Sequence, residues 1–345
     1  MSAPGQYTCS FGGYRGDEEA VLAFRNATRP LAEGREYFEW RYHTPAGAPA
    51  PVVCWLRGPD GRAAGMAAVI FRRYWYQGRP AWIPVAGDIG LRPELRGQGL
   101  GAVLLAGMTA YLRERHAEVP AFVLPTEAAR RTLAACGWLD AGRLVPHVFL
   151  ARPDDWLRAR LPGAVIRGAS GLYTRVIGAL LRDDAGIAAR LEDVTGFDDA
   201  YDELDRSAPP APVPRRCLDA AALRWRYAQN PRVRFETTRL MTQGKLAGFV
   251  VASRLGDDLH LHDVVAAEPS GFVPLMKGVL TRVLRRADAR SLRFALADTH
   301  PYRAHLRRLF FIARPAEAAT FQVLAPSGVT VPPGPWHITS GDKDI

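Results

Sequence analysis

The 345-residue sequence has few cysteines and no long apolar run, and each shortage excludes a class of protein. Its four cysteines, Cys9, Cys54, Cys136 and Cys217, lie far apart and form no CxxC or Cys/His pattern, so we expect no metal site and no disulfide framework. The sequence has no run of about 18 apolar residues and no basic stretch followed by an apolar one at its N-terminus, so we expect no integral membrane segment and no secretory signal. These features favour a protein of the reducing cytoplasm.

Concentrated positive charge is also missing. The 45 Lys and Arg residues exceed the 35 Asp and Glu residues to give a net charge of +10, and the two halves of the chain share this excess evenly. Nucleic-acid-binding arms concentrate their charge, whereas an evenly basic surface suits small anionic partners, so we expect an anionic cofactor and no nucleic acid. A chain of this length with 48% hydrophobic residues is too large for one ordinary core and suits two domains.

A short motif occurs twice and indicates an internal duplication. The stretch FEWRYHTPAG (38–47) returns as LRWRYAQNPR (223–232), and each copy is followed by a strand pair, an aspartate (Asp88 or Asp263) and a long amphipathic helix. This order favours two copies of one α/β unit. We interpret the repeated Trp-Arg-Tyr residues as core anchors, with a substrate-binding role as the alternative. The expected organisation is a first domain at 7–152, a helical linker at 153–189, a degenerate second domain at 190–326 and an irregular tail at 327–345.

The first copy begins with short strands and continues into a strand and a long helix. The turn Pro59-Asp60-Gly61 between two apolar stretches predicts a β-hairpin, and residues 81–91 predict the next strand. Apolar residues then recur with the period of one helix face, so we expect this helix to pack on the sheet. The stripe comprises Leu100, Val103, Leu104, Gly107, Met108, Tyr111 and Leu112.

The segment LRPELRGQGLGAVLL (91–105) places alternate glycines at the start of this helix. A helix N-terminus carries unpaired N–H groups and a partial positive charge, and glycines let a diphosphate approach without obstruction from Cβ atoms. Arg96 adds a full charge beside them. The segment therefore favours an anion-binding loop over a turn that uses glycine for conformational freedom alone. A dinucleotide fingerprint does not fit, because Pro93 separates the strand from the glycines, and a Walker loop would need Gly-Lys-Ser/Thr.

The pattern Arg96-x-x-Gly99-x-Gly101 resembles the acyl-CoA pyrophosphate loop, R/Q-x-x-G-x-G/A, of the GCN5-related N-acetyltransferase (GNAT) superfamily. The preceding IGLRP resembles the end of that family's fourth strand, and the order of elements is similar over most of 7–152 and more faintly over the second copy. The resemblance implies an α/β (α+β) fold class with two tandem GNAT-like domains. Each would be a mixed, mostly antiparallel sheet flanked by helices.

The same resemblance implies acetyl-CoA, or another acyl-CoA, as the cofactor. The family's fourth and fifth strands splay apart, so the pantetheine arm would pair with the backbone at Ile89 and Leu91, and Arg96 would stand at the rim of the loop. The pyrophosphate would lie on the backbone N–H groups of Gly97, Gln98, Gly99, Leu100, Gly101 and Ala102.

Candidate catalytic and acceptor-binding residues follow from their places in this arrangement. Asp88, at the end of the fourth strand, is the candidate general base, and the alternative is a structural carboxylate that caps a loop or pairs with an arginine. The N–H of Ile89 would polarise the thioester carbonyl. Glu36, Glu39 and Tyr42 lie in the region that resembles the family's acceptor-binding helices, and the alternative for each is a solvated helix face.

Two departures from the family pattern concern proton donation and the second copy. The stretch TEAARRTLAACGW (126–138) resembles the family's N-x-x-A-x-x-x-Y-x-x-x-G-F segment, but Thr126 replaces the Asn and Leu133 replaces the Tyr that often serves as general acid. Solvent or another tyrosine would then protonate the thiolate, unless the domain no longer catalyses. In the second copy Pro274 falls at the position of Gly99, so we expect that copy not to bind CoA.

These observations predict an acyl-CoA-dependent N-acyltransferase that transfers an acetyl or related group to an amine of a small molecule or sugar intermediate. The alternative is a catalytically inactive CoA-binding sensor or scaffold, which the absent tyrosine favours. The expected partner is a small-molecule acceptor.

Overall fold

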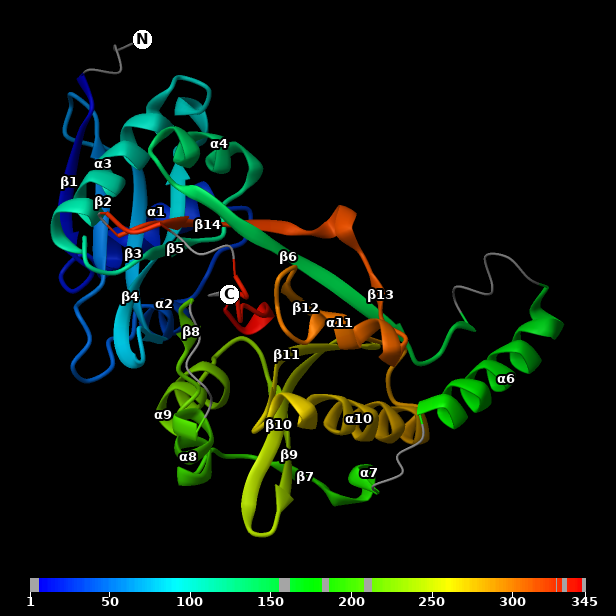
Figure 1. The fold of residues 1–345 in the computed structure, drawn as a ribbon. Helices are drawn as coiled ribbons and strands as arrows, with labels where there is room; N and C mark the ends of the chain where they lie inside the picture. The colour runs from blue at the N-terminus through cyan, green and yellow to red at the C-terminus, as the bar shows by residue number, and fades with distance from the viewer. Residues whose placement is uncertain are drawn as a thin grey trace. The chain divides into compact units, whose positions relative to one another are not determined.

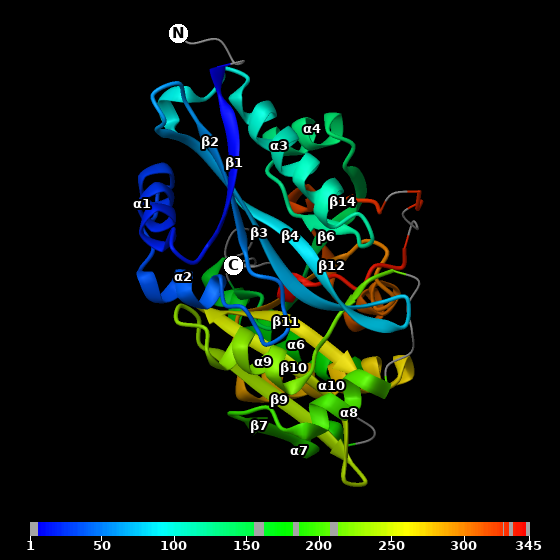
Figure 2. The same ribbon diagram turned by 90° about the vertical axis from the view of Figure 1, so that its left-hand side faces the viewer.

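The structure is a computed structural model that describes residues 6–154, 162–181, 186–207, 213–326, 328–330 and 334–342 (Figures 1 and 2). The chain divides into two compact units, and both are discontinuous in sequence. Unit 1 comprises Met1–Arg143, Ala211–Arg216 and Ala319–Gly334, and unit 2 comprises Leu144–Pro210, Cys217–Ala318 and Pro335–Ile345.

Unit 1 is built on a mixed sheet with the strand order β1-β2-β3-β4-β5-β14. Its neighbours pair antiparallel except β4 and β5, which are parallel, and the short strand β8 adds to β3. The elements are β1 (Thr8–Gly13), α1 (Glu18–Thr28), α2 (Arg35–Arg41), β2 (Val52–Arg57), β3 (Ala63–Tyr76), β4 (Arg79–Leu91), η2 (Pro93–Leu95), α3 (Leu100–Arg115), β5 (Ala121–Val123), α4 (Glu127–Ala135), β8 (Arg215–Arg216) and β14 (Ala319–Leu324).

Unit 2 repeats this plan with the order β6-β12-β11-β10-β9-β7, in which β11 and β12 form the parallel pair and β13 adds to β6. Its elements are β6 (Leu139–Leu150, from Leu144 onward), α6 (Gly163–Leu181), α7 (Ile187–Arg190), β7 (Leu191–Val194), α8 (Asp199–Ser207), α9 (Ala220–Leu223), the π-helical turn η3 (Arg224–Ala228), β9 (Phe235–Thr242), β10 (Lys245–Leu255), β11 (Asp258–Ala266), η4 (Pro269–Gly271), α10 (Phe272–Arg286), β12 (Ser291–Ala297), α11 (Arg303–Leu306), η5 (Arg307–Leu309), β13 (Ile312–Ala313), η6 (Pro315–Glu317) and η7 (Ser340–Asp342).

Each unit includes strand residues from the other half of the chain, and unit 1 includes two such strands, β8 and β14. In unit 1, β5 pairs antiparallel with β14, which lies near the C-terminus, and in unit 2 β12 pairs in the same way with residues 144–150 of β6. This exchange makes the units discontinuous, whereas the predicted domains at 7–152 and 190–326 are continuous. Each borrowed strand covers a strand edge that would otherwise present unpaired backbone groups.

The core of unit 1 forms where α3 packs on the sheet. The predicted helix is confirmed over Leu100–Arg115, and so is the hairpin between β2 and β3. Val103 and Tyr111 of the predicted stripe are only half-buried, whereas Leu105 is buried. Gly107 marks a close approach, because a Cβ there would lie 2.5 Å from the sulfur of Cys9. The fully buried side chains of α3 include Leu100, Leu104, Leu105, Met108 and Leu112.

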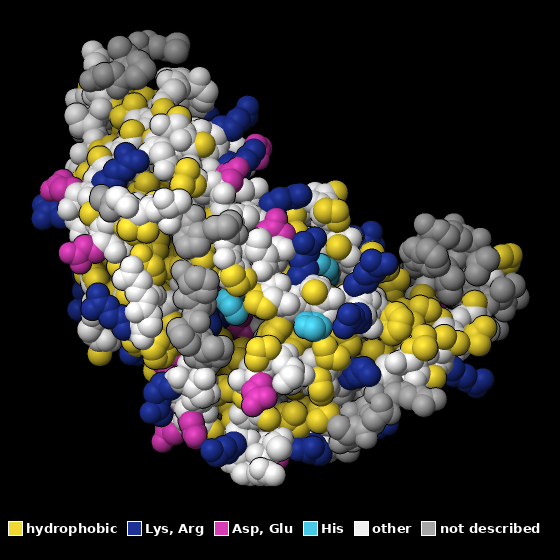
Figure 3. Space-filling model, viewed as in Figure 1, with side chains coloured by type: hydrophobic (Ala, Val, Ile, Leu, Met, Phe, Trp, Pro, Cys, Tyr) yellow, Lys and Arg dark blue, Asp and Glu magenta, His cyan; other side chains and the backbone are white. Residues whose placement is uncertain are grey.

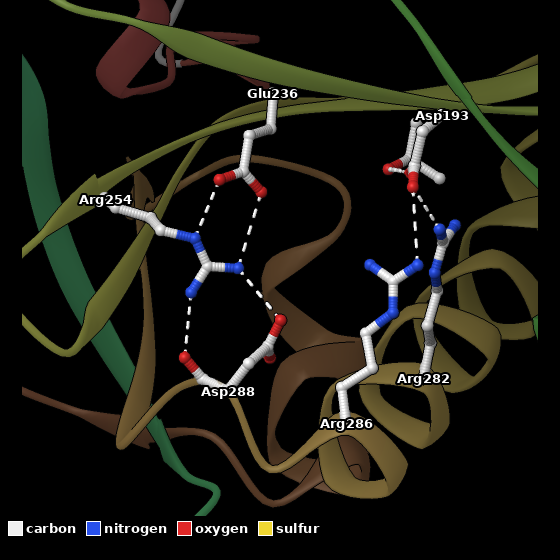
Figure 4. Close-up of polar contacts among 7 residues, drawn as sticks. Asp193, Glu236, Arg254, Arg282, Arg286 and Asp288 are labelled. Carbon is white, nitrogen blue, oxygen red and sulfur yellow. Dashed lines mark hydrogen bonds and ion pairs between the residues drawn. The ribbon is translucent and has the colours of Figure 1, made fainter.

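Ionic contacts in unit 2 join the C-terminal end of α10 to strands β7, β9 and β10 (Figure 4). The guanidinium of Arg254 lies between two carboxylates, 2.7 Å from Glu236 and 3.0 Å from Asp288. These side chains are a third or more exposed, so each such pair contributes about 0.2–1 kcal/mol at most. The pairs join Arg254 to Glu236 and Asp288, and Arg282 and Arg286 to Asp193.

Candidate active site

Strand β4 carries a bulge near its C-terminal end. The register of β3 against β4 shifts between Met66 and Ala68, so two residues of β4, Asp88 and Ile89, lie opposite one residue of β3. Asp88 has a φ of 50°, in the left-handed region that a non-glycine residue occupies only when its surroundings hold it there. The contacts of the Asp88 side chain therefore decide whether the bulge keeps its shape.

Three side chains from α1 and the end of α2 hold the Asp88 carboxylate. Arg25 Nη2 lies 2.8 Å from Oδ1, Arg41 Nε donates to Oδ2 at 2.8 Å, and the Tyr42 hydroxyl donates to Oδ2 at 2.8 Å. The carboxylate is 3% exposed and the side chains of Arg25 and Arg41 are 11% and 8% exposed. These contacts tie α1 and α2 to the bulge of β4.

The ion pairs determine the protonation state of Asp88. Burial acts to raise its pKa, but the charges of Arg41 and Arg25, together with hydrogen bonds from Arg41 and Tyr42, outweigh burial and hold the pKa below its ordinary value. Burial raises the pKa of Tyr42 well above its ordinary value, so Tyr42 is a neutral donor. A carboxylate with a lowered pKa is a weak base, so these surroundings favour the alternative role for Asp88, a structural carboxylate that pairs with an arginine.

Unit 2 repeats the contact between the motif tyrosine and the strand aspartate. The Tyr227 hydroxyl donates to Asp263 Oδ2, and the Thr339 hydroxyl donates to Oδ1 at 2.8 Å. The repeated Trp-Arg-Tyr motif thus carries the tyrosine that binds the repeated aspartate, which agrees with its interpretation as an anchor. The two pairs of equivalent residues were visible in the sequence, but no sequence pattern marked Arg25 as a partner of Asp88.

The gap between β4 and β5 begins next to the bulge. Parallel pairing ends after two registers, Val85 with Phe122 and Ala86 with Val123, while β4 continues on its β3 side as far as Leu91. Residues 87–91 of β4 therefore extend beyond β5, as expected for strands that splay apart. Arg29 Nη2 donates to the carbonyl of Ile89 at 3.3 Å, so a cation borders this edge.

The glycine loop that follows β4 presents backbone N–H groups. Gly97 and Gly99 have φ values of 78° and 77°, and a Cβ at either position would meet no atom within 4 Å. In the described part of the chain, the N–H groups of residues 97–101 have no protein acceptor, whereas that of Ala102 donates to the Gly99 carbonyl at 3.0 Å. The N-terminus of α3 therefore offers a row of unpaired donors with open space in front of the glycines.

Arg96 lies at the edge of this loop and is exposed. Its Nη2 donates to the carbonyl of Thr28, at the C-terminal end of α1, at 3.1 Å. The side chain thus joins the loop to α1, which also supplies Arg25. One helix contacts both the loop and the bulge.

Helix α4 offers no hydroxyl at the position where the resembling family often has its tyrosine. Leu133 is fully buried in the core of unit 1, and the Thr126 side chain caps α4 by accepting from the N–H of Ala129 at 3.4 Å. Cys136 is half-buried, and burial raises the pKa of its thiol, so it is a poor nucleophile.

The expected acceptor-binding residues are in different environments. Glu36 and Glu39 are exposed on α2, and Glu39 lies 3.9 Å from Arg35, which also pairs with Glu19. Tyr42 is buried at 2% exposure and is bound to Asp88. The structure therefore brings Tyr42 and Asp88 together, and it leaves the two glutamates on the solvent side of α2.

In unit 2 the gap that corresponds to the one between β4 and β5 is filled by the chain's own C-terminal tail. Parallel pairing of β11 with β12 ends at Leu261 and Phe294. Beyond this point the N–H of Ala297 donates to the carbonyl of Ile338 at 2.8 Å. Residues 335–342 therefore supply backbone partners where, in the resembling fold, a pantetheine arm would pair.

Side chains fix this tail in place. Trp336 is 1% exposed, and the Ser340 hydroxyl donates to the carbonyl of Leu261 at 2.7 Å. The helix of this unit begins differently as well. Gly271, the last residue of the turn η4 and the residue before α10, has a φ of −74°, whereas Gly97 and Gly99 of unit 1 have positive φ values. Unit 2 thus departs from unit 1 both in the loop and in the gap.

Two general features of the described residues bear on the kind of site. They contain no group of three or more His, Cys, Asp or Glu side chains placed to hold a metal ion. None of their helices is both long and apolar enough to cross a membrane.

The sequence model of the acetyltransferase (GNAT) family matches residues 18–138, which include the bulge and the glycine loop. The chain therefore contains a domain of the acetyltransferase (GNAT) family, and its two units have the predicted tandem GNAT-like fold. No curated protein matches the sequence significantly.

Solved structures resemble the chain over more than nine-tenths of its length. A GCN5-related N-acetyltransferase from Anabaena variabilis has a TM-score of 0.61 at 13% identity, covering 92% of this chain and 72% of that chain. A probable N-acyltransferase from Enterococcus faecalis has a TM-score of 0.59 at 12% identity, covering 93% and 73%. A tandem GNAT protein from the clavulanic acid biosynthesis pathway has a TM-score of 0.53 at 17% identity, covering 94% and 100%. At these identities the likeness shows the fold.

Proposed function

We propose that the protein is an acyl-CoA-dependent N-acyltransferase whose reaction takes place on unit 1, with acetyl-CoA as the acyl donor. The observation that carries this proposal is the row of N–H groups at residues 97–101, which have no acceptor among the residues that the structure describes, beside the edge of β4 that β5 leaves uncovered. In a GNAT domain these two features are where a diphosphate and an amide-bearing arm are expected to bind.

The loop fits a diphosphate on physical grounds. Unpaired N–H groups at a helix N-terminus and the helix dipole both favour an anion, and the positive φ values of Gly97 and Gly99 direct the backbone without side chains in front of it. We assign the pyrophosphate of the acyl-CoA to residues 97–102, with Arg96 at the rim, and its pantetheine arm to the backbone of Ile89 and Leu91.

Transfer begins when the ammonium form of the acceptor loses a proton to solvent, and the neutral amine attacks the thioester carbonyl. The C–S bond then breaks, the nitrogen releases its second proton to solvent to form the amide, and the thiolate gains a proton. The N–H of Ile89, at the bulge, is assigned to stabilise the charge that develops on the carbonyl oxygen. Asp88 acts by holding the bulge, since its two arginine partners and lowered pKa make it a weak base. Because Leu133 occupies the position of the usual tyrosine, solvent supplies the proton to the thiolate.

The acceptor is a cationic amine on a small molecule or sugar intermediate. Glu36 and Glu39 are exposed carboxylates on α2, the helix that runs into the Asp88 contacts, and they would attract such an amine before it loses its proton. Tyr42 supports the site through Asp88, with which it is hydrogen-bonded.

A CoA-binding sensor or scaffold is the second candidate function. It is favoured by one observation, the burial of Leu133 at a position where the resembling family often has its general acid. Turnover separates the two functions. Free thiol that appears from acetyl-CoA only when an amine is added supports the transferase, and tight CoA binding without turnover across an amine library supports the sensor.

The loop assignment is tested by the rise in melting temperature that acetyl-CoA causes. We expect Gly99→Val to abolish this rise, because the side chain would block the N–H groups, and Arg96→Ala to reduce it. Gly78→Val is the matched control, since Gly78 has the same φ of 77° and the same open surroundings but lies in the β3–β4 turn. An undiminished rise in Gly99→Val would place the cofactor elsewhere.

A further inference from the structure

Unit 2 contains a cavity of about 510 Å³ on the side of α11. Its walls come from His147 of β6, from His300 in the loop after β12, from Arg303 of α11 and Arg307 of η5, and from the apolar side chain of Phe311. This volume is typical of sites for small molecules. The cavity lies in unit 2, where residues 335–342 fill the gap between β11 and β12. It is therefore separate from the candidate active site of unit 1.

The charges around this cavity are unbalanced. Arg303 Nη1 donates to the backbone carbonyl of Asp298 at 2.9 Å, and Arg307 has no ion-pair partner among the residues that the structure describes. Asp298 is the acidic residue among the lining side chains, against two guanidinium groups. Figure 3 shows Lys/Arg and His side chains gathered on the face over α11. The cavity therefore has a surplus of positive charge.

Two buried imidazoles line the cavity, and His147 is held by the backbone, because its Nδ1 lies 2.9 Å from the carbonyl oxygen of Val145. His147 is 4% exposed and His300 6% exposed. Burial lowers the pKa of both, with the charge of Arg303 adding to the effect at His147, and the pKa of His300 falls to about 3. The N–H of Tyr302 donates to His300 Nδ1 at 3.1 Å, which leaves the proton of this neutral ring on Nε2.

A cavity of similar size in unit 1 shows why charge balance matters. It measures about 530 Å³ and is lined by Arg62 and Arg92 but also by Asp60 and Glu94, so its charges cancel. Arg62 lies 3.8 Å from Asp60, and Arg92 Nε donates to the carbonyl of Ala63 at 2.6 Å. The two cavities therefore differ in charge: the lining of the unit 1 cavity balances two arginines against two carboxylates, whereas that of the unit 2 cavity sets two arginines against one.

We propose that the cavity of unit 2 is a second ligand site, which binds a small organic anion consisting of a carboxylate or phosphate monoester on a flat apolar group. The anion contacts Arg303 and Arg307, which provide planar, charged donors suited to either oxyanion. The apolar group lies against Phe311 and Ala313. Occupation of this site is independent of the glycine loop of unit 1.

Calorimetric titration of the full chain at constant ionic strength tests this site with phenylphosphate, benzoate and the uncharged analogue benzyl alcohol. We expect one anion per chain to bind saturably and benzyl alcohol not to bind. Binding of phenylphosphate alone assigns a phosphate monoester, and binding of benzoate alone assigns a carboxylate. The absence of saturable binding by either anion, or equal binding of benzyl alcohol, overturns the proposal.

Two arginine variants locate the binding. Arg307→Ala should raise the dissociation constant of the anion about tenfold or more, because the substitution removes a charge-assisted contact. Arg308→Ala is the matched control, since Arg308 is the next exposed arginine of η5 but does not line the cavity. Equal losses in both variants would overturn the proposal, as would loss of binding in Gly99→Val, which would place the anion at the glycine loop. Far-UV circular dichroism confirms that each variant is folded.

Discussion

Replacing Asp88 by asparagine tests the role that the structure gives this residue. Asparagine keeps an oxygen that can accept from the Tyr42 hydroxyl, but it removes the charge that compensates Arg25 and Arg41. Both guanidinium groups are largely buried, and Arg25 Nε and Nη1 are buried with no hydrogen-bond partner in the described ranges of the chain. The Asp88 carboxylate therefore compensates the charges of two buried arginines, Arg25 and Arg41.

The expected loss of stability is large. Removing one partner of a buried ion pair costs about 3–5 kcal/mol, because the remaining charge stays in a poorly solvated place. This loss corresponds to roughly two to four orders of magnitude in the opening equilibrium of unit 1. The control is Glu39→Gln, which changes the same charge at a pair 3.9 Å apart with more than half of both side chains exposed, and it should cost about 0–1 kcal/mol.

Native-state hydrogen exchange of the α1 and β4 amides measures this loss within unit 1, so that unfolding of unit 2 does not confuse the result. A loss in Asp88→Asn no greater than that in Glu39→Gln would refute the ion-pair argument. If Asp88→Asn keeps its amide protection but loses all turnover, Asp88 is the general base.

Three further predictions concern pH, packing and the tail. The pKa of Asp88 is lower in the folded protein than its ordinary value of 3.8, so its ion pairs stabilise unit 1 fully above that value and lose this effect as the pH falls toward the folded pKa. The difference in amide protection between wild type and Asp88→Asn should therefore become smaller on acidification. Gly107→Ala should destabilise unit 1 by about 1–3 kcal/mol in urea denaturation, because the new Cβ would lie 2.5 Å from the Cys9 sulfur, and adding Cys9→Ala should recover part of this loss. Trp336→Ala should cost about 3–5 kcal/mol and remove the exchange protection of the Ala297 amide while unit 1 keeps its own; unchanged protection would show that the tail is not held by this side chain.

Local patterns predicted much of unit 1. The apolar stripe of α3 and the turn between β2 and β3 follow from the spacing of residues close together in the chain, so a single sequence was enough to predict their positions. The loop at 96–102 was predicted for the same reason, because alternate glycines at the start of a helix are typical of a backbone that binds an anion. The duplication was visible because two short motifs kept their order.

The sequence by itself determined the GNAT-like class, the duplication and the place of the glycine loop, since each depends on residues close together in the chain. Only the tertiary structure decided that Arg25 and Arg41 neutralise Asp88, that β6 and β14 pair in the opposite unit, and that residues 335–342 fill the gap of unit 2. Ion pairs and strand pairings of this kind join residues tens to hundreds of positions apart. Their energies depend on burial and distance, which arise when the chain has folded.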